Sequence, residues 1–147
     1  MKLNAEQECD NLMNSLLPTA QNLLSKYKGF HPYGGFIEPN GQIRHVSVRD
    51  ETTEYPDAED LIETLENLFK KKACAYTCTT TAIICDVRVK MPGSEQKRDA
   101  IRVRLDHEEG YSTEVFFPYE IVKDEICWGE IFAHEGKNLI FRDRKLQ

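Results

Sequence analysis

The chain has 147 residues, 40% of them hydrophobic and 30% charged, which is the composition of one ordinary soluble domain. Its formal net charge of −6 disfavours nucleic acid as a partner, because phosphate binding requires a positive surface. Apolar runs are too short to span a membrane, and the N-terminus turns acidic where a signal peptide needs an apolar block, so we expect a cytoplasmic protein.

The first half of the chain predicts two helices and a hairpin. Residues 4–27 have helical periodicity, and Pro18 leaves open whether they form one kinked helix or two. A hairpin is predicted over residues 33–48, because Asn40 and Gly41 favour a turn between two short apolar runs. A second helix is predicted over residues 57–71, with Asp57 as its N-cap. The buried stripe of the first helix is expected to contain Leu12, Leu16, Ala20, Leu23, Leu24 and Tyr27.

The most informative region is 82–119, where apolar and charged residues alternate with a period of two. This pattern predicts consecutive antiparallel strands over residues 82–90, 99–106 and 111–119. Two further short strands are predicted over residues 126–133 and 138–141, around a turn at Gly136. Residues 1–147 are therefore expected to form a single α+β domain, in which a central antiparallel sheet (a β-hairpin plus a C-terminal meander) is flanked by two helical segments.

The turn at residues 108–110 predicts a register for the meander. A three-residue hairpin loop with Gly110 in the left-handed position places Arg104 opposite Glu114 on the solvent face. If the preceding hairpin keeps the same faces, Asp86 lies on the other side of Arg104. The result would be a ladder of acid, base and acid across three strands.

No catalytic motif is present in the chain. It contains no GxSxG, P-loop, GxGxxG or HExxH sequence, and its four histidines are scattered among turns and strand ends. Cys85 is followed by an acid and Cys127 is preceded by two, so neither setting favours a thiolate. The sequence thus favours a protein that is not an enzyme, although it leaves open whether carboxylates pair in space for acid–base chemistry.

The five cysteines are odd in number and show no CxxC spacing. Cys74 and Cys78 lie four residues apart, but without a second pair they do not supply the usual ligand set of structural zinc. We therefore expect reduced thiols that pack as small hydrophobic groups, with no metal and no cofactor.

Two surfaces are candidates for contact with a partner. Residues 50–66 include eight acidic and no basic residues, and they form either the solvated face of a helix or a docking surface for a basic protein. The aromatic residues late in the chain either mark an interface or are covered by the N-terminal helix. The candidate partner-binding residues are Glu54, Asp57, Glu59, Asp60, Glu63, Phe116 and Trp128.

Two resemblances bear on these predictions. The order helix, two strands, helix and then three or more antiparallel strands resembles that of profilin-like and roadblock/longin-like domains, which implies a central sheet flanked by helices. The blocks CDVRVKMPGS (85–94), RDAIRVRLDH (98–107) and GYSTEVFFPY (110–119) resemble small bacterial proteins of uncharacterised function. Some acidic single-domain proteins of this size are immunity proteins that neutralise a cognate toxin, and the likeness implies such a role.

Three hypotheses result from the sequence. The leading one is a non-enzymatic cytosolic protein that binds another protein, a basic one in its immunity-like form, with no nucleic acid or membrane as partner. Its rival is a small-ligand-binding domain or an unrecognised hydrolase with a pocket between sheet and helix. The candidate lining residues of that pocket are Tyr33, Arg88, Arg102, His107 and Tyr111. The third hypothesis is self-association as a homodimer.

Overall fold

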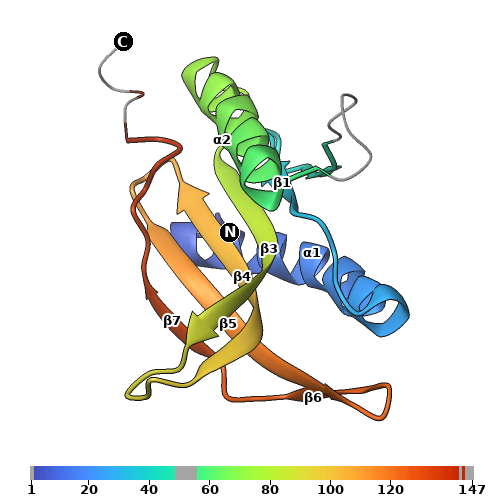
Figure 1. Ribbon diagram of the computed structural model, residues 1–147. Helices are drawn as coiled ribbons and strands as arrows, with labels where there is room; N and C mark the ends of the chain where they lie inside the picture. The colour runs from blue at the N-terminus through green and yellow to red at the C-terminus, as the bar shows by residue number, and fades with distance from the viewer. Residues whose placement is uncertain (1, 49–55, 143, 145–147) are drawn as a thin grey trace.

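The computed structural model describes residues 2–48, 56–142 and 144. In this part of the chain two helices and seven strands form an α+β fold with a central antiparallel sheet, as predicted (Figure 1). The strand order is β2-β1-β3-β4-β5-β6, and β7 also pairs with β5. The elements are α1 (Ala5–Tyr27), β1 (Tyr33–Ile37), β2 (Ile43–Val46), α2 (Ala58–Cys74), β3 (Thr80–Lys90), β4 (Lys97–His107), β5 (Ser112–Val122), β6 (Glu125–Trp128) and β7 (Phe132–Glu135).

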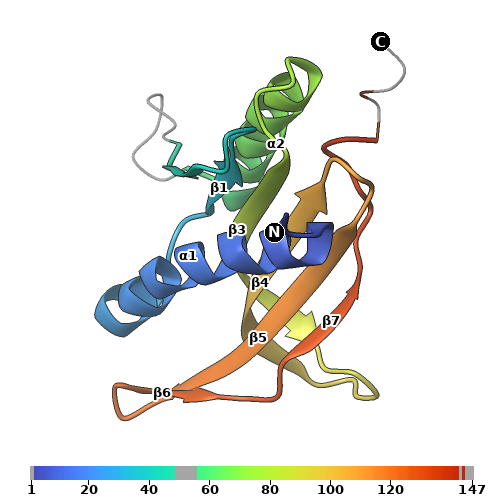
Figure 2. The same cartoon turned by 180° about the vertical axis from the view of Figure 1, so that it is seen from behind.

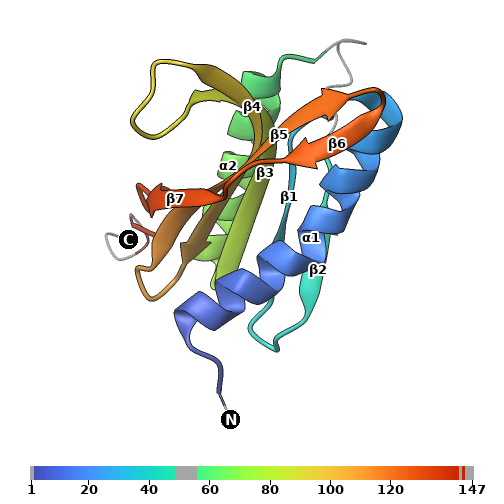
Figure 3. The ribbon, with the colours of Figure 1, turned by 90° about the horizontal axis from the view of Figure 1, so that it is seen from below.

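The two helices cover opposite faces of the sheet. Helix α1 lies across β1, β3 and β4, and Figure 2 shows it crossing that face. Helix α2 packs on the other face, where its backbone lies close to β1 and β3, and its Glu66 side chain reaches Arg104 on β4 at 3.0 Å. On the α2 side, β5 and the rest of β4 are not covered by a described helix. Figure 3 shows the sheet between the two helices and the β3–β4 and β5–β6 hairpins diverging from each other.

Helix α1 is one continuous helix that contains Pro18. Asn4 begins it with a capping box, in which its side chain accepts from the Gln7 backbone and the Gln7 side chain accepts from the Asn4 backbone. The predicted stripe is largely confirmed, since the buried side chains are Cys9, Leu12, Leu16, Ala20 and Leu24. The inclusion of Tyr27 is wrong: this side chain is 70% exposed, because it lies in the last turn of the helix.

Helix α2 begins where the sequence predicts and ends three residues later than predicted, at Cys74. The Asp57 carboxylate accepts a hydrogen bond from the Glu59 backbone and caps the helix. Phe69 packs against β1 at Gly34, where a Cβ atom would collide with the Ala82 carbonyl oxygen and meet the Phe69 ring. The close approach of helix and sheet therefore requires glycine at this position.

The predicted register is correct on one side of β4 and wrong on the other. Arg104 lies opposite Glu114, and the loop at residues 108–110 is closed by the His107 backbone N–H, which donates to the carbonyl of Tyr111. However, β3 pairs so that Ile83 lies opposite Arg104 and Asp86 lies opposite Ile101. Because side chains alternate between faces, this odd shift moves Asp86 to the α1 side of the sheet. The three-strand ladder does not form.

The C-terminal strands differ from their predicted ranges. The segment 126–133 is divided into β6 and β7, which pair with different ends of β5. The segment 138–141 is not a strand; it is a turn that crosses the α2 side of the sheet. Its neighbouring side chains Ile140 and Phe141 are both buried in the core cluster of Phe69, so they do not alternate as strand residues would.

No described helix has both the length and the apolar character needed to cross a membrane.

Candidate functional site

The predicted partner-binding residues do not form one surface. Glu54 lies outside the described residues. Glu59, Asp60 and Glu63 are exposed on the first turns of α2, where Asp57 is the N-cap. Trp128 lies on β6, and no contact joins α2 to β6 in the described part of the chain. The acidic turns of α2 and the late aromatic residues are thus separate features.

Phe116 is buried, so its expected role as an exposed contact residue is wrong. It lies on the α2 side of the sheet, as its strand parity predicts, but only 5% of it is exposed. The ring of Phe132 on β7 stacks on it with centroids 4.8 Å apart and planes 8° apart, and the imidazole of His134 lies 5.0 Å away. Strand β7 pairs with β5 and so brings Phe132 and His134 over the Phe116 ring, which is covered by β7 and not by either helix.

Trp128, by contrast, is exposed at an edge of the sheet. Its side chain is 45% exposed and makes an edge contact with Tyr119 on β5. Strand β6 pairs with β5 on one side only, and no described strand lies on its other side. Val122 and Ile131, which flank β6 in the chain, are also exposed hydrophobic residues. We call residues 120–131 the β6 edge.

The β6 edge is also acidic. It carries four acids and a single lysine. The four acids, Glu120, Asp124, Glu125 and Glu130, are all exposed. Of these, Asp124 has an ion-pair partner among the described residues, the Lys28 ammonium at 3.5 Å. An exposed tryptophan among carboxylates on an unpaired strand edge is an arrangement suited to contact with another chain.

The predicted pocket residues do not converge. Tyr33 is buried and donates its hydroxyl to the Leu16 carbonyl at 2.6 Å, and burial raises the pKa of its phenol. Arg88 lies opposite Asp99 and Arg102 lies opposite Cys85, which places the two arginines on opposite faces of the sheet. Tyr111 packs against the core beneath α1.

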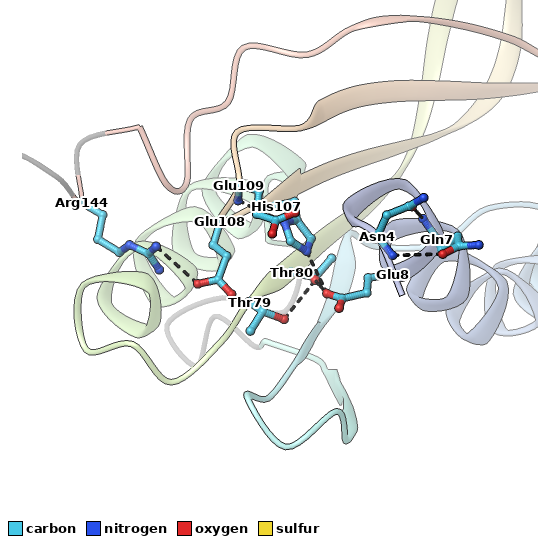
Figure 4. A network of polar contacts seen from close by, with 9 residues as sticks. All are labelled: Asn4, Gln7, Glu8, Thr79, Thr80, His107, Glu108, Glu109 and Arg144. Atoms are coloured by element: carbon cyan, nitrogen blue, oxygen red, sulfur yellow. Dashed lines mark hydrogen bonds and ion pairs between the residues drawn. The ribbon is translucent and has the colours of Figure 1, made fainter. Parts of the chain in front are cut away.

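His107, the fifth of these residues, belongs to a buried network rather than a pocket (Figure 4). Its Nδ1 accepts a hydrogen bond from the Glu109 backbone N–H at 3.1 Å, so the ring proton lies on Nε2. Nε2 then donates to Glu8 Oε2 at 2.8 Å, and the Thr80 hydroxyl lies 3.3 Å from the same oxygen. Both ring nitrogens are occupied, so the imidazole has no free lone pair for use as a general base.

The cysteines are all unpaired, and the buried ones are poorly suited to nucleophilic chemistry. Burial raises the pKa of Cys9 to about 12 and that of Cys78 to about 11. The pKa of Cys85 is also raised by burial, although the Arg102 guanidinium lies 3.6 Å from its sulfur and acts in the opposite direction. Among the described residues no group of three histidine, cysteine or carboxylate side chains is arranged to hold a metal ion.

A polar cavity of about 170 Å³ lies over β4 and β5 on the face that α2 leaves uncovered. Arg102, Arg104 and Asp106 line it from β4, and Glu114 lines it from β5. The segment after β7, at residues 136–139, forms another wall. Of these residues, sequence reasoning singled out Arg102 as a ligand contact. The cavity itself was not predictable, because its wall comes from a segment expected to be a strand.

A larger groove of about 680 Å³ lies between the second half of α1 and the β1–β2 hairpin. Its lining is mainly apolar, with side chains such as Leu23, Tyr27 and Phe30. Two of its polar side chains have partners: His45 Nε2 lies 2.8 Å from the Ser15 hydroxyl, and the Tyr33 hydroxyl donates to the Leu16 carbonyl on α1. The groove therefore offers shape and apolar surface rather than a catalytic arrangement.

Comparison with known proteins does not identify a family. The chain matches no family model, and no curated protein or solved structure is detectably similar to it.

Proposed function

We propose that this protein acts by binding another protein, a positively charged one, without catalysing a reaction. The observation that carries the proposal is the β6 edge, where Trp128 is exposed among four carboxylates on a strand that has a described partner strand on one side only. Tryptophan is enriched among the residues that dominate binding energy at protein interfaces. The five unpaired cysteines suit a reducing compartment, and we place this activity in the cytoplasm.

The mode of binding follows from the geometry of an edge strand. The outer backbone N–H and C=O groups of β6 are free to pair with an extended segment of the partner. Trp128 and Ile131 would contact apolar side chains of that segment. The carboxylates of Glu125 and Glu130 would attract lysine and arginine, which speeds association and favours basic partners over acidic ones.

The exposed acids of α2, Glu59, Asp60 and Glu63, contribute to the same preference from a distance. They add negative field around the molecule and so steer a basic partner towards it, more strongly at low ionic strength. An immunity-like role, in which this protein neutralises a basic toxin, is the sharpest form of the proposal.

The test is affinity capture from the source organism with tagged wild-type protein and two variants. Trp128→Ala removes the exposed aromatic from the β6 edge. Tyr27→Ala is the matched control, because it removes an aromatic that is 70% exposed on α1. We expect wild type and Tyr27→Ala to retain one basic protein in stoichiometric amount, and Trp128→Ala to lose it.

Three results would contradict the proposal: no stoichiometric partner, capture that survives Trp128→Ala, or capture lost only in Tyr27→Ala. The last result would place the contact in the apolar groove beside α1. Light scattering of the purified protein gives an independent check, since a homodimer abolished by Trp128→Ala would make the occupant of the β6 edge a second copy of this chain.

A further inference from the structure

Two of the residues that line the polar cavity over β4 and β5, Arg102 and Asn138, each have a buried polar atom without a hydrogen-bond partner among the described residues. The cavity lies on the opposite face of the sheet from α1 and is walled by residues 136–139. A dry cavity of roughly 150 Å³ is large enough to hold benzene, so 170 Å³ admits a small organic molecule.

The weakly paired cation of the cavity is Arg102. Its Nε atom is buried and has no hydrogen-bond acceptor in the described part of the chain. Among the described residues, its Nε atom forms an ion pair with Glu114 Oε1 at the long distance of 4.0 Å, and its Nη2 atom lies 3.6 Å from the Cys85 sulfur. Arg104, in contrast, is paired at 3.0 Å with Glu66 on α2. Arg102 is therefore only weakly paired, which makes it the side chain of this cavity best suited to meet a carboxylate.

The acceptor without a hydrogen-bond donor among the described residues belongs to Asn138, in the segment after β7. Ser112 donates its hydroxyl to Asp106 Oδ1 at 2.6 Å and accepts from the Asn138 backbone N–H at 3.0 Å, which holds these three residues together. The Asn138 side-chain oxygen is buried and receives no hydrogen bond from the described residues. Asp106 and Arg102 share one face of β4 four residues apart, a Cα separation of roughly 13 Å by the rise of a strand.

The charges of the cavity exclude several classes of ligand. Arg102, Arg104 and Lys137 are balanced by Asp106 and Glu114 in the lining together with Glu66, the partner of Arg104. Three positive and three negative groups leave no net charge. The cavity therefore has no surplus charge to balance either a phosphate dianion or a bare cation. A molecule with an acid at one end and a hydrogen-bond donor at the other matches the arrangement.

We propose that this cavity binds a small amino- or hydroxy-carboxylic acid. Its carboxylate lies against Arg102, and its ammonium or hydroxyl group donates to the nearby carboxylate of Glu114 and faces the wall formed by Asp106 and Asn138. This site is separate from the β6 edge and does not depend on the binding of a protein partner.

The experiment is titration of the ¹⁵N-labelled protein with the standard L-amino acids and short α-hydroxy acids at millimolar concentration, followed by NMR. Acetate, methylammonium and inorganic phosphate are the single-function controls. We expect at least one amino or hydroxy acid to cause saturable shifts confined to β4, β5 and residues 136–139. Acetate and methylammonium should bind at least about tenfold more weakly, since each loses one charged hydrogen bond.

Variants then locate the site. Arg102→Met should weaken binding about tenfold or more, whereas Arg88→Met, on the other face of the sheet, should leave it unchanged. Trp128→Ala should also leave it unchanged. If Arg102→Met does not fold, Arg102→Lys and Asn138→Ala replace it, and each should weaken binding. The proposal is wrong if no acid of the panel gives saturable shifts, if acetate or phosphate binds as tightly, or if the cavity variants bind like wild type.

Discussion

The imidazole of His107 at the end of β4 donates from Nε2 to the carboxylate of Glu8 in the first turn of α1, at 2.8 Å and across 99 residues of sequence. This hydrogen bond joins the start of α1 to the end of the sheet where β3 begins and β4 ends. The Glu109 backbone N–H fixes the tautomer that makes this donation possible.

Loss of this contact should destabilise the fold. We expect Glu8→Gln and His107→Gln each to lower the free energy of unfolding by about 1–3 kcal/mol. The first replaces a charged acceptor by a neutral amide oxygen, and the second removes the ring that joins Glu8 to the Glu109 backbone. A double-mutant cycle measured by urea unfolding should give a coupling of about 0.5–3 kcal/mol. Glu6→Gln is the matched control, since it removes an acid from the first turn of the same helix without breaking a hydrogen bond. Equal effects of Glu6→Gln and Glu8→Gln would contradict the prediction.

Asp106 should make stability depend on pH. Burial raises its pKa above the ordinary value of 3.8, while the Ser112 hydroxyl acts in the opposite direction. The folded state thus holds the proton of Asp106 more tightly than the unfolded state does. The free energy of unfolding therefore falls as pH rises from 3.8 through the pKa of the folded state, and above that pKa this contribution stays constant. Asp106→Asn keeps an acceptor for Ser112 and removes the charge. The free energy of unfolding of Asp106→Asn, measured with urea, should therefore increase relative to that of wild type over this pH range. A difference that is the same at all pH values would contradict the prediction.

The cysteines should differ sharply in reactivity. Cys127 is exposed on β6, whereas Cys9, Cys78 and Cys85 are buried with raised pKa values. Under native conditions at mildly alkaline pH, iodoacetamide should alkylate Cys127 first and the buried three only after unfolding. Peptide mass spectrometry over time gives the order. Rapid native labelling of Cys9 would show that the end of α1 opens from the sheet.

Gly34→Ala should be among the most damaging single-methyl changes. The added Cβ atom would collide with the carbonyl of Ala82 and press on Phe69, which forces strand β1 away from α2. Overpacking of this kind costs about 1–3 kcal/mol, and displacement of backbone adds to it. Gly93→Ala is the control, because its Cβ would meet nothing within 4 Å and only its left-handed backbone is penalised, by about 1 kcal/mol. In thermal unfolding, the Tm of Gly34→Ala should be well below the Tm of Gly93→Ala.

The sequence by itself determined the helices and the strands as far as β5, together with much of their local geometry. The period-two alternation of residues 82–119 corresponds to β3, β4 and β5, and the turn at residues 108–110 set Arg104 opposite Glu114. The cap at Asp57 likewise marked the start of α2. These features depend on residues close together in the chain, whose backbone preferences and face alternation are local properties.

Tertiary structure alone decided which side chains meet. The register of β3 on β4 placed Asp86 on the α1 side, the pairing of β7 with β5 buried Phe116, and the turn after β7 closed a cavity over Arg102. Each outcome depends on contacts between segments far apart in sequence. A one-residue shift of register exchanges the faces of a whole strand, and no local pattern fixes that shift when both faces are covered.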